Sequence, residues 1–179
     1  MYRVPAPQGL LSQGDIFRGR FIFPYSERPD QDFQIVRGDA TAAVSQTPDA
    51  WAQGSEVALL PAQMALFAIV LSNSCDAEND EGKDAVEFVA MGAIFPLDKI
   101  PDEKNKNNVR HNKIIRYQHL ESSPETGLAE SYVHFGLVAL VAQETLVQSK
   151  NSRILSLESP YRESLGHRFG EFFGRVAVP

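Results

Sequence analysis

Short apolar segments, separated by turn-forming residues, recur along most of the chain and predict a β-rich fold. In residues 16–23 the side chains alternate, so that Phe17, Phe21 and Phe23 share one face of an extended strand. Residues 65–71 are apolar at every position, as expected of a strand that is buried on both faces. We therefore expect 65–71 to form the middle of a sheet.

Other segments of this kind are shorter or carry a glycine. We expect further strands at 33–36, 40–44, 55–60, 85–95, 113–119, 131–141 and 153–157. Gly92 and Gly136 fall inside two of them, and a glycine inside a strand pattern indicates a kink or bulge. Gly14 and Asp15 form a turn signal directly before the first strand. About seven to nine short strands predict a mainly β fold, an SH3-like or related small β-barrel.

The end of the chain changes from the strand period to the helix period. Ser159 and Pro160 are a typical helix start, a hydroxyl cap followed by proline. Large apolar residues then recur every three or four positions, at Tyr161, Leu165, Phe169, Phe172 and Phe173. A row of glycines, each costing about 1 kcal/mol in a helix interior, would destabilise an isolated helix. We expect an amphipathic helix at 159–176 that docks either on its own barrel or on a partner.

A chain of 179 residues is long enough for one domain with a buried core. We expect a single domain over 1–179, with an N-terminal arm at 1–13, the barrel at 14–157 and the helix at 159–176. Polar stretches predict three loop excursions from the barrel, at 24–32, 76–84 and 96–112.

Composition favours a globular protein of the cytoplasm. Hydrophobic residues make up 43% of the chain and charged residues 22%, which is ordinary for a folded domain. One cysteine cannot form an internal disulfide, and the N-terminal sequence MYRVPAPQG has no secretory pattern. The apolar runs are far shorter than the roughly 20 residues that span a bilayer. We expect a cytoplasmic location and no membrane contact.

Charge is distributed unevenly along the sequence. The net charge of −6 is unfavourable for non-specific nucleic-acid binding, because phosphate attraction requires a basic surface. Residues 76–84, however, carry five acids and one lysine, whereas 104–116 carry five cations and no acid. The two segments could attract each other or serve separate partners.

The basic segment is a candidate for nucleic-acid binding, because it combines cations with a ring that can stack on a base. The candidate residues are Lys104, Lys106, Arg110, Lys113, Arg116 and Tyr117. Together they offer phosphate contacts and a stacking surface for single-stranded RNA. The alternative is a solvated surface loop, which is what a run of charges usually forms.

The single cysteine is a candidate nucleophile. A reactive thiol requires a histidine or another cation that lowers its pKa, and a group that orients the base. Cys75 closely follows the apolar segment 65–71, with Asp76 beside it and His134 inside the segment 131–141. These three form the candidate catalytic set, although the charge of Asp76 would raise the thiol pKa. The alternative is that Cys75 fills a small apolar position at the end of a buried strand.

The sequence favours neither metal nor cofactor binding. Acids in 76–87 approach the spacing of a calcium loop, but Gly82 stands one place late and the flanking segments are strand-like. His111 and His119 lie eight positions apart, which is not a chelating spacing for zinc. No dinucleotide fingerprint, phosphate loop or nucleophile elbow is present. We expect neither a metal nor a cofactor.

The order of QGDIF, LSNSCD, SYVHF, SPYRESL and FFGRVAVP resembles a group of small bacterial and phage proteins of unassigned function. GDI followed by an apolar strand that ends in serine is similar to the SH3-like barrels of PemK-type toxins, which are ribosome-independent endoribonucleases. This similarity implies a barrel with an RNA-cleaving site, for which the candidates are Arg18, Arg20, Arg116 and His134. The chain departs from the toxin pattern at 64–66, where an Arg-Pro pair is usual, and in its C-terminal helix. The similarity therefore supports the barrel more than the cleavage chemistry.

The leading functional hypothesis is a non-catalytic interaction module that docks a protein partner, or a second copy, through the C-terminal helix. It rests on the aromatic face of that helix and on the lack of a convergent catalytic set. One alternative is a nucleic-acid-binding protein or a PemK-like endoribonuclease built on 104–119. Another is a cysteine-dependent enzyme that uses Cys75. The glycine row of the helix would also allow the close approach of two copies in a homodimer.

Overall fold

The computed structural model describes residues 1–5, 11–24, 34–36, 57–59, 62–72 and 87–176. Contacts divide the chain into two compact units, Met1–Phe23 with Met64–Pro179, and Pro24–Gln63. The smaller unit contains the antiparallel pair of β3 (Gln34–Val36) and β4 (Val57–Leu59). These strands confirm the expectations at 33–36 and 55–60, while 40–44 lies outside the described residues.

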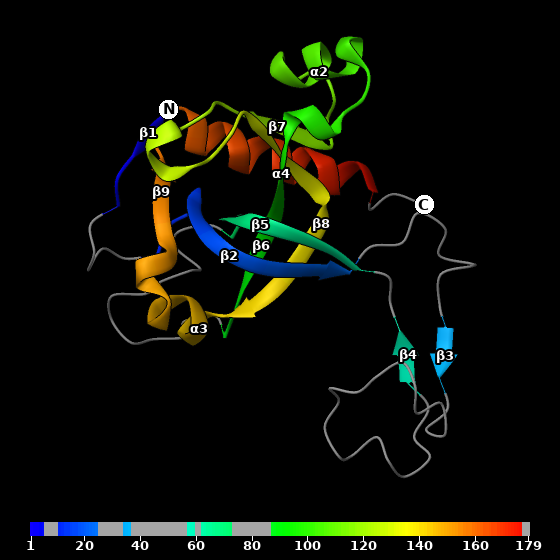
Figure 1. The fold of residues 1–179 in the computed structure, drawn as a ribbon, viewed down its shortest axis with the longest axis vertical. Coiled ribbons are helices and arrows are strands. Elements are labelled where there is room, and N and C mark those ends of the chain that lie inside the picture. Colours follow the sequence, from blue (N-terminus) through cyan, green and yellow to red (C-terminus); the bar gives the residue numbers. More distant parts are fainter. Residues whose placement is uncertain (6–10, 25–33, 37–56, 60–61, 73–86, 177–179) are drawn as a thin grey trace. The chain divides into compact units, whose positions relative to one another are not determined.

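The larger unit is built on one seven-stranded sheet that curls into a half-barrel (Figure 1). In sheet order the strands are β1 (Tyr2–Arg3), β9 (Arg153–Leu157), β2 (Asp15–Pro24), β5 (Ala62–Val70), β6 (Phe88–Pro96), β8 (Ser131–Ala142) and β7 (Tyr117–Leu120). The apolar strand β5 lies in the middle of the sheet, as its sequence predicts. A mainly β fold with a C-terminal helix is therefore confirmed.

The C-terminal helix α4 (Tyr161–Val176) covers one face of the sheet. Its Leu165 is fully buried in the main hydrophobic core, together with Ile69 of β5 and Phe135 of β8. The rings of Phe169 and Phe172 lie against Phe135, with centroids 5.7 and 6.1 Å apart. The apolar side of the helix thus packs on the sheet of its own chain.

A buried polar cluster fixes the start of β2 against β9. Asp15 is 1% exposed and accepts hydrogen bonds from the backbone N–H of Ser12 and the hydroxyl of Ser156. Nη1 of Arg153 donates to the same carboxylate at 3.1 Å, so that the buried charge is paired. The φ of Gly14 is 86°, in the left-handed region that favours glycine. The turn expected at Gly14 and Asp15 is confirmed.

Two glycines lie where the pairing of β6 with β8 becomes irregular. The pairing of β6 with β8 shifts register between Gly92 and Ala93. Residues 135–137 of β8 stand opposite this step, so that β8 carries a bulge centred on Gly136. The irregularities expected at both glycines are confirmed. The bulge directly follows His134 in β8.

The prediction of a loop excursion over the whole of 96–112 is wrong. This stretch contains the short 3₁₀ helix η2 (Leu97–Lys99) and the helix α2 (Glu103–Arg110). Asp102 caps α2 by accepting a hydrogen bond from the backbone N–H of Asn105 at 2.9 Å. Val109 is the one buried residue of the helix, so the sequence has no apolar period to reveal it. The excursions expected at 24–32 and 76–84 fall almost wholly outside the described residues.

The N-terminal arm expected at 1–13 begins with a strand. Tyr2 pairs with Leu157 of β9, and its hydroxyl donates a hydrogen bond to the carbonyl oxygen of Glu121 at 2.6 Å. The arm is therefore part of the sheet at Tyr2–Arg3. Among the described residues, the remaining short helices are η3 (Pro124–Thr126), α3 (Gln143–Gln148) and η4 (Lys150–Ser152). The strand expected from 113 begins later, as β7 at Tyr117.

Candidate functional site

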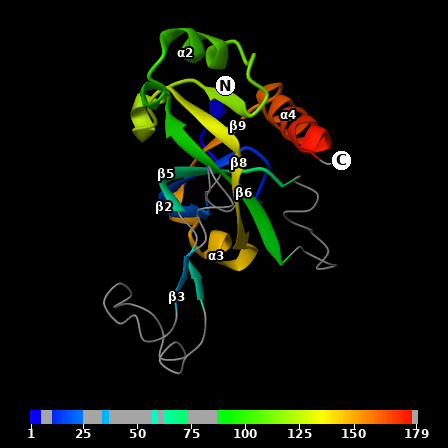
Figure 2. The same ribbon diagram turned by 90° about the vertical axis from the view of Figure 1, so that its right-hand side faces the viewer.

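The helix α2 packs over one end of β6, β8 and β7, and this packing creates the surroundings of the candidate site (Figure 2). Val109 of α2 meets Leu97 and Tyr132 in a second hydrophobic cluster, with Phe95 and Tyr117 partly buried around it. One apolar residue thus anchors a helix whose other residues are polar. The helix is attached to the sheet but exposes most of its length.

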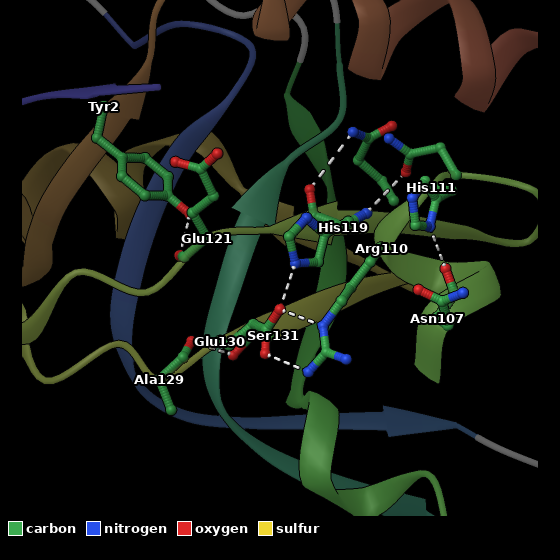
Figure 3. Close-up of polar contacts among 11 residues, drawn as sticks. Tyr2, Asn107, Arg110, His111, His119, Glu121, Ala129, Glu130 and Ser131 are labelled. Carbon is green, nitrogen blue, oxygen red and sulfur yellow. Dashed lines mark hydrogen bonds and ion pairs between the residues drawn. The ribbon is translucent and has the colours of Figure 1, made fainter. Parts of the chain in front are cut away.

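A charged cluster holds the end of α2 in place. Arg110 donates two parallel hydrogen bonds to the carboxylate of Glu130, from Nε and Nη2 at 2.8 Å each. Nε2 of His119 lies 3.0 Å from Oε1 of the same carboxylate, and Figure 3 shows both side chains converging on Glu130. The hydrogen bond from Arg110, supported by His119, holds the pKa of Glu130 at about 2. The cluster therefore carries a permanent ion pair that ties α2 to the start of β8.

A pocket of about 450 Å³ opens beside this helix. Its walls are formed by Lys99, Ile100, Pro101, Asn105, Ile114, Arg116, Tyr117 and Tyr132. They come from η2 and the residues after it, from α2, from the segment before β7, and from β7 and β8. The volume lies in the range of small-ligand sites in proteins.

Aromatic rings form one wall of the pocket in a fixed arrangement. Tyr117 meets the ring of Tyr132 edge to face, with centroids 4.8 Å apart. On its other side, Tyr117 contacts the ring of His134 at 5.1 Å. Tyr132 is 8% exposed and also packs against Phe95. Held from both sides, the Tyr117 ring is positioned before any ligand arrives.

The polar part of the wall is positive. Lys99 and Arg116 are exposed cations from two different segments, and none of the lining residues is acidic. Asn105 adds an exposed side-chain amide, which can both donate and accept hydrogen bonds. The pocket can therefore hold a ligand that combines an anionic group with a flat or apolar body.

The structure separates the six predicted nucleic-acid-binding residues into three pairs. Arg110 is neutralised by Glu130, and Nζ of Lys106 lies 2.5 Å from the carboxylate of Glu103. Lys104 and Lys113 are exposed, on α2 and in the segment after it. Arg116 and Tyr117 line the pocket. Two of the six predicted residues thus reach the candidate site directly.

Six of the eight lining residues were not predicted from the sequence, and three of these six, Lys99, Asn105 and Tyr132, are polar or aromatic. Tyr132 shares one face of β8 with His134, and the strand pairing places it opposite His119 of β7. The alternation of SYVHF could have indicated that face, once β7 was known to pair with it. Lys99 and Asn105 had no signal, because only the path of the chain through η2 and α2 brings them to the pocket.

His134, the predicted catalytic base, lies next to the pocket wall on β8. Nδ1 accepts a hydrogen bond from the backbone N–H of Gly136 at 3.1 Å. Burial, followed by the charge of Arg116, lowers the pKa of His134 from 6.5 to about 4, so the ring is neutral at pH 7. A neutral imidazole has one acceptor nitrogen, and here it is already engaged. Cys75 and Asp76 lie outside the described residues, so the predicted catalytic set stays a prediction.

Within the described part of the chain, no group of three or more histidine, cysteine, aspartate or glutamate side chains is placed to hold a metal ion. Among the same residues, no helix is long and apolar enough to cross a membrane. No family model, curated protein or solved structure matches the chain. Functional inference therefore rests on the geometry of the site itself.

Proposed function

We propose that the chain is a non-catalytic binding module for single-stranded RNA, which holds one nucleotide unit in the pocket beside α2. One observation carries the proposal. Two cations, an amide and two tyrosine rings meet in a single pocket whose lining contains no carboxylate.

Each part of a nucleotide finds a chemical match in this lining. Arg116 offers a guanidinium that binds phosphate through paired hydrogen bonds, and Lys99 offers a second positive charge. The partly exposed ring of Tyr117, with the buried ring of Tyr132 packed against it, provides an aromatic surface for the base. The amide of Asn105 can exchange hydrogen bonds with the ribose 2′-hydroxyl, the group that distinguishes RNA from DNA.

The chemistry of the site favours binding over cleavage. A ribonuclease requires a general base within hydrogen-bonding reach of the hydroxyl that it activates. The acceptor nitrogen of His134 is engaged with Gly136, and the low pKa makes the ring a weak base. Three other expectations stay predictions from the sequence, namely PemK-like cleavage, an SH3-like topology and chemistry at Cys75.

The protein-docking hypothesis rests on the aromatic face of α4. Leu165, Phe169 and Phe172 of that face pack on the core of their own chain, whereas Tyr161 and Phe173 are exposed. Four expectations stay predictions from the sequence: docking of a protein partner, self-association through α4, a homodimer and a cytoplasmic location. The pocket is the stronger support, because both its cations and its amide are exposed and its lining contains no acid.

Fluorescence anisotropy with a labelled single-stranded RNA of about ten nucleotides tests the proposal. The wild-type protein should bind saturably, and more tightly to RNA than to DNA of the same sequence. Arg116→Ala should weaken RNA binding about tenfold, since a hydrogen bond to a charged group contributes about 1.5 kcal/mol.

Arg3→Ala is the matched control. Arg3 is an exposed cation on β1, at the opposite edge of the seven-stranded sheet from β7. Its removal changes the net charge by the same amount and should leave RNA affinity unchanged. An equal loss of affinity in both variants, or no saturable binding by the wild-type protein, would contradict the proposed function. Equal affinity for RNA and DNA would contradict the role of Asn105.

A further inference from the structure

Arg168 of α4 connects the C-terminal helix to the segment before β7. Its Nη1 donates a hydrogen bond to the carbonyl oxygen of Asn112 at 2.9 Å. Its Nη2 donates to the carbonyl oxygens of Ile114 and Tyr117, at 3.0 and 2.8 Å. One guanidinium thus gathers three backbone carbonyls from a single short segment. Because the donor is charged, these bonds are stronger than those between neutral groups.

The segment that Arg168 holds is a wall of the pocket. Ile114, Arg116 and Tyr117 all line it, while residues 113–116 belong to no helix or strand. The backbone hydrogen bonds of this wall include Tyr117 N–H to Ile114 and Phe135 N–H to Arg116. Ile114 also packs against the cluster of Leu97, Val109 and Tyr132, and the three hydrogen bonds from Arg168 add a contact between this segment and α4.

The part of α4 around Arg168 is packed against the hydrophobic core. Arg168 follows Leu165, which is fully buried in the core, and precedes Phe169, whose ring packs against Phe135. Both ribbon views show α4 and α2 at the same end of the sheet, with the segment before β7 between them (Figures 1 and 2). None of the lining residues belongs to α4. The helix therefore reaches the pocket wall directly through the segment that it holds, and indirectly through Phe135 of β8, the strand that carries Tyr132.

We propose that α4 positions the RNA pocket through Arg168, so that docking of the helix and binding of the ligand are energetically coupled. The identity of the ligand rests on the proposed function, whereas the positioning of the wall does not. Arg168 is thus a positioning residue, and its effect reaches the ligand through Ile114, Arg116 and Tyr117. Coupling between two sites is reciprocal, so a ligand in the pocket must also stabilise the docked helix.

The first test needs no ligand. In methyl NMR spectra of the full chain, Arg168→Met should shift the signal of Ile114, which lies in the pocket wall, and leave that of Ile154 in β9 unchanged. Arg162→Met is the matched control, since Arg162 is on the same helix and pairs with the neighbouring Glu163. The Ile114 signal should keep its position in that control. An unshifted Ile114 signal in Arg168→Met would overturn the positioning role.

The second test adds the labelled RNA. Arg168→Met should weaken binding about tenfold, a usual size for coupling between sites, and Arg162→Met should bind as the wild type does. Arg168→Lys keeps the charge but lacks the planar pair of donors, so its affinity should fall between the two. Equal affinities in Arg168→Met and the wild type would overturn the coupling.

The third test uses the wild-type protein alone and does not depend on any variant folding. Saturating RNA should slow hydrogen exchange at the amides of α4, although no residue of that helix lines the pocket. A purely structural role of Arg168 would slow the amides of α4 no more than the core amides of the sheet, which a bound ligand protects through global stability, and this result would overturn the coupling. If the wild-type protein binds no RNA, the proposed function fails, while the Ile114 signal still decides the positioning role.

Discussion

At the scale of single residues, the surroundings of His134 set a charge state that differs between the folded and the unfolded chain. Its ring contacts Tyr117 and lies near the guanidinium of Arg116. Burial first, and this charge second, lower the pKa of His134 to about 4. An unfolded chain would protonate the same ring near pH 6.5. Between these values only the unfolded state takes up the proton.

This difference predicts that the free energy of unfolding falls as the pH is lowered from about 6.5 towards 4, because proton uptake favours the unfolded chain. Urea unfolding at several pH values above about 4.5 measures the effect before most carboxylates titrate. His134→Gln keeps a neutral polar side chain and should reduce the pH dependence. His111→Gln, at an exposed histidine, should retain it. The same slope in His134→Gln and the wild type would contradict the low pKa.

Single residues also show what the sequence can predict. The turn at Gly14 and the irregularities at Gly92 and Gly136 follow from the backbone freedom of glycine, which is a local property. The burial of Asp15 is not local, because its partner Ser156 lies 141 positions away in the sequence. Local patterns therefore identified where the chain turns, but not which polar side chain is enclosed there.

At the scale of elements, α2 shows why a polar helix escapes a pattern analysis. Its sequence EKNKNNVR has a single apolar residue, so the expected period is missing and the stretch resembles a loop. The helix is stabilised instead by the Asp102 cap, the burial of Val109 and the ion pair of Arg110 with Glu130. The burial of Val109 and the ion pair of Arg110 both involve residues that are far apart in the sequence. A local sequence pattern cannot reveal such contacts.

Truncation of the apolar anchor should release this helix. Val109→Ala removes two methyl groups from a fully buried site and should lower the free energy of unfolding by about 2 kcal/mol. Since α2 carries Asn105 into the pocket, RNA affinity should fall as well. Val4→Ala is the matched control, because Val4 is 79% exposed and its truncation should change stability by less than about 0.5 kcal/mol. Urea unfolding and anisotropy provide the two measurements, and a Val109→Ala protein that matches Val4→Ala in both would contradict the anchoring role.

Strongly periodic elements were predictable. The apolar strand β5 and the amphipathic helix α4 were both expected from their spacing alone. Whether α4 docks on its own chain was not decided by the sequence, because the same aromatic face could cover a partner. The packing of Phe169 and Phe172 against Phe135 shows that the described helix docks on its own chain.

At the scale of the whole molecule, charge works against RNA binding. The chain has a net charge of −6, so attraction to phosphate has to come from a local group of cations. The sequence indicated a basic segment, but the structure neutralises Lys106 and Arg110 with acids. Lys99 and Arg116 are the cations in the pocket lining. RNA binding should therefore depend on a small number of phosphate contacts.

The salt dependence of RNA affinity tests this claim most directly. Each phosphate neutralised on a single strand contributes about −0.7 to the slope of log affinity against log salt, so two cations predict about −1.4. Affinity should then fall about sevenfold between roughly 50 and 200 mM salt. The combined substitution Lys99→Ala with Arg116→Ala should bring the slope close to zero, whereas Arg3→Ala should keep the wild-type slope. A wild-type slope near zero, or an unchanged slope in the doubly substituted protein, would contradict RNA binding in this pocket.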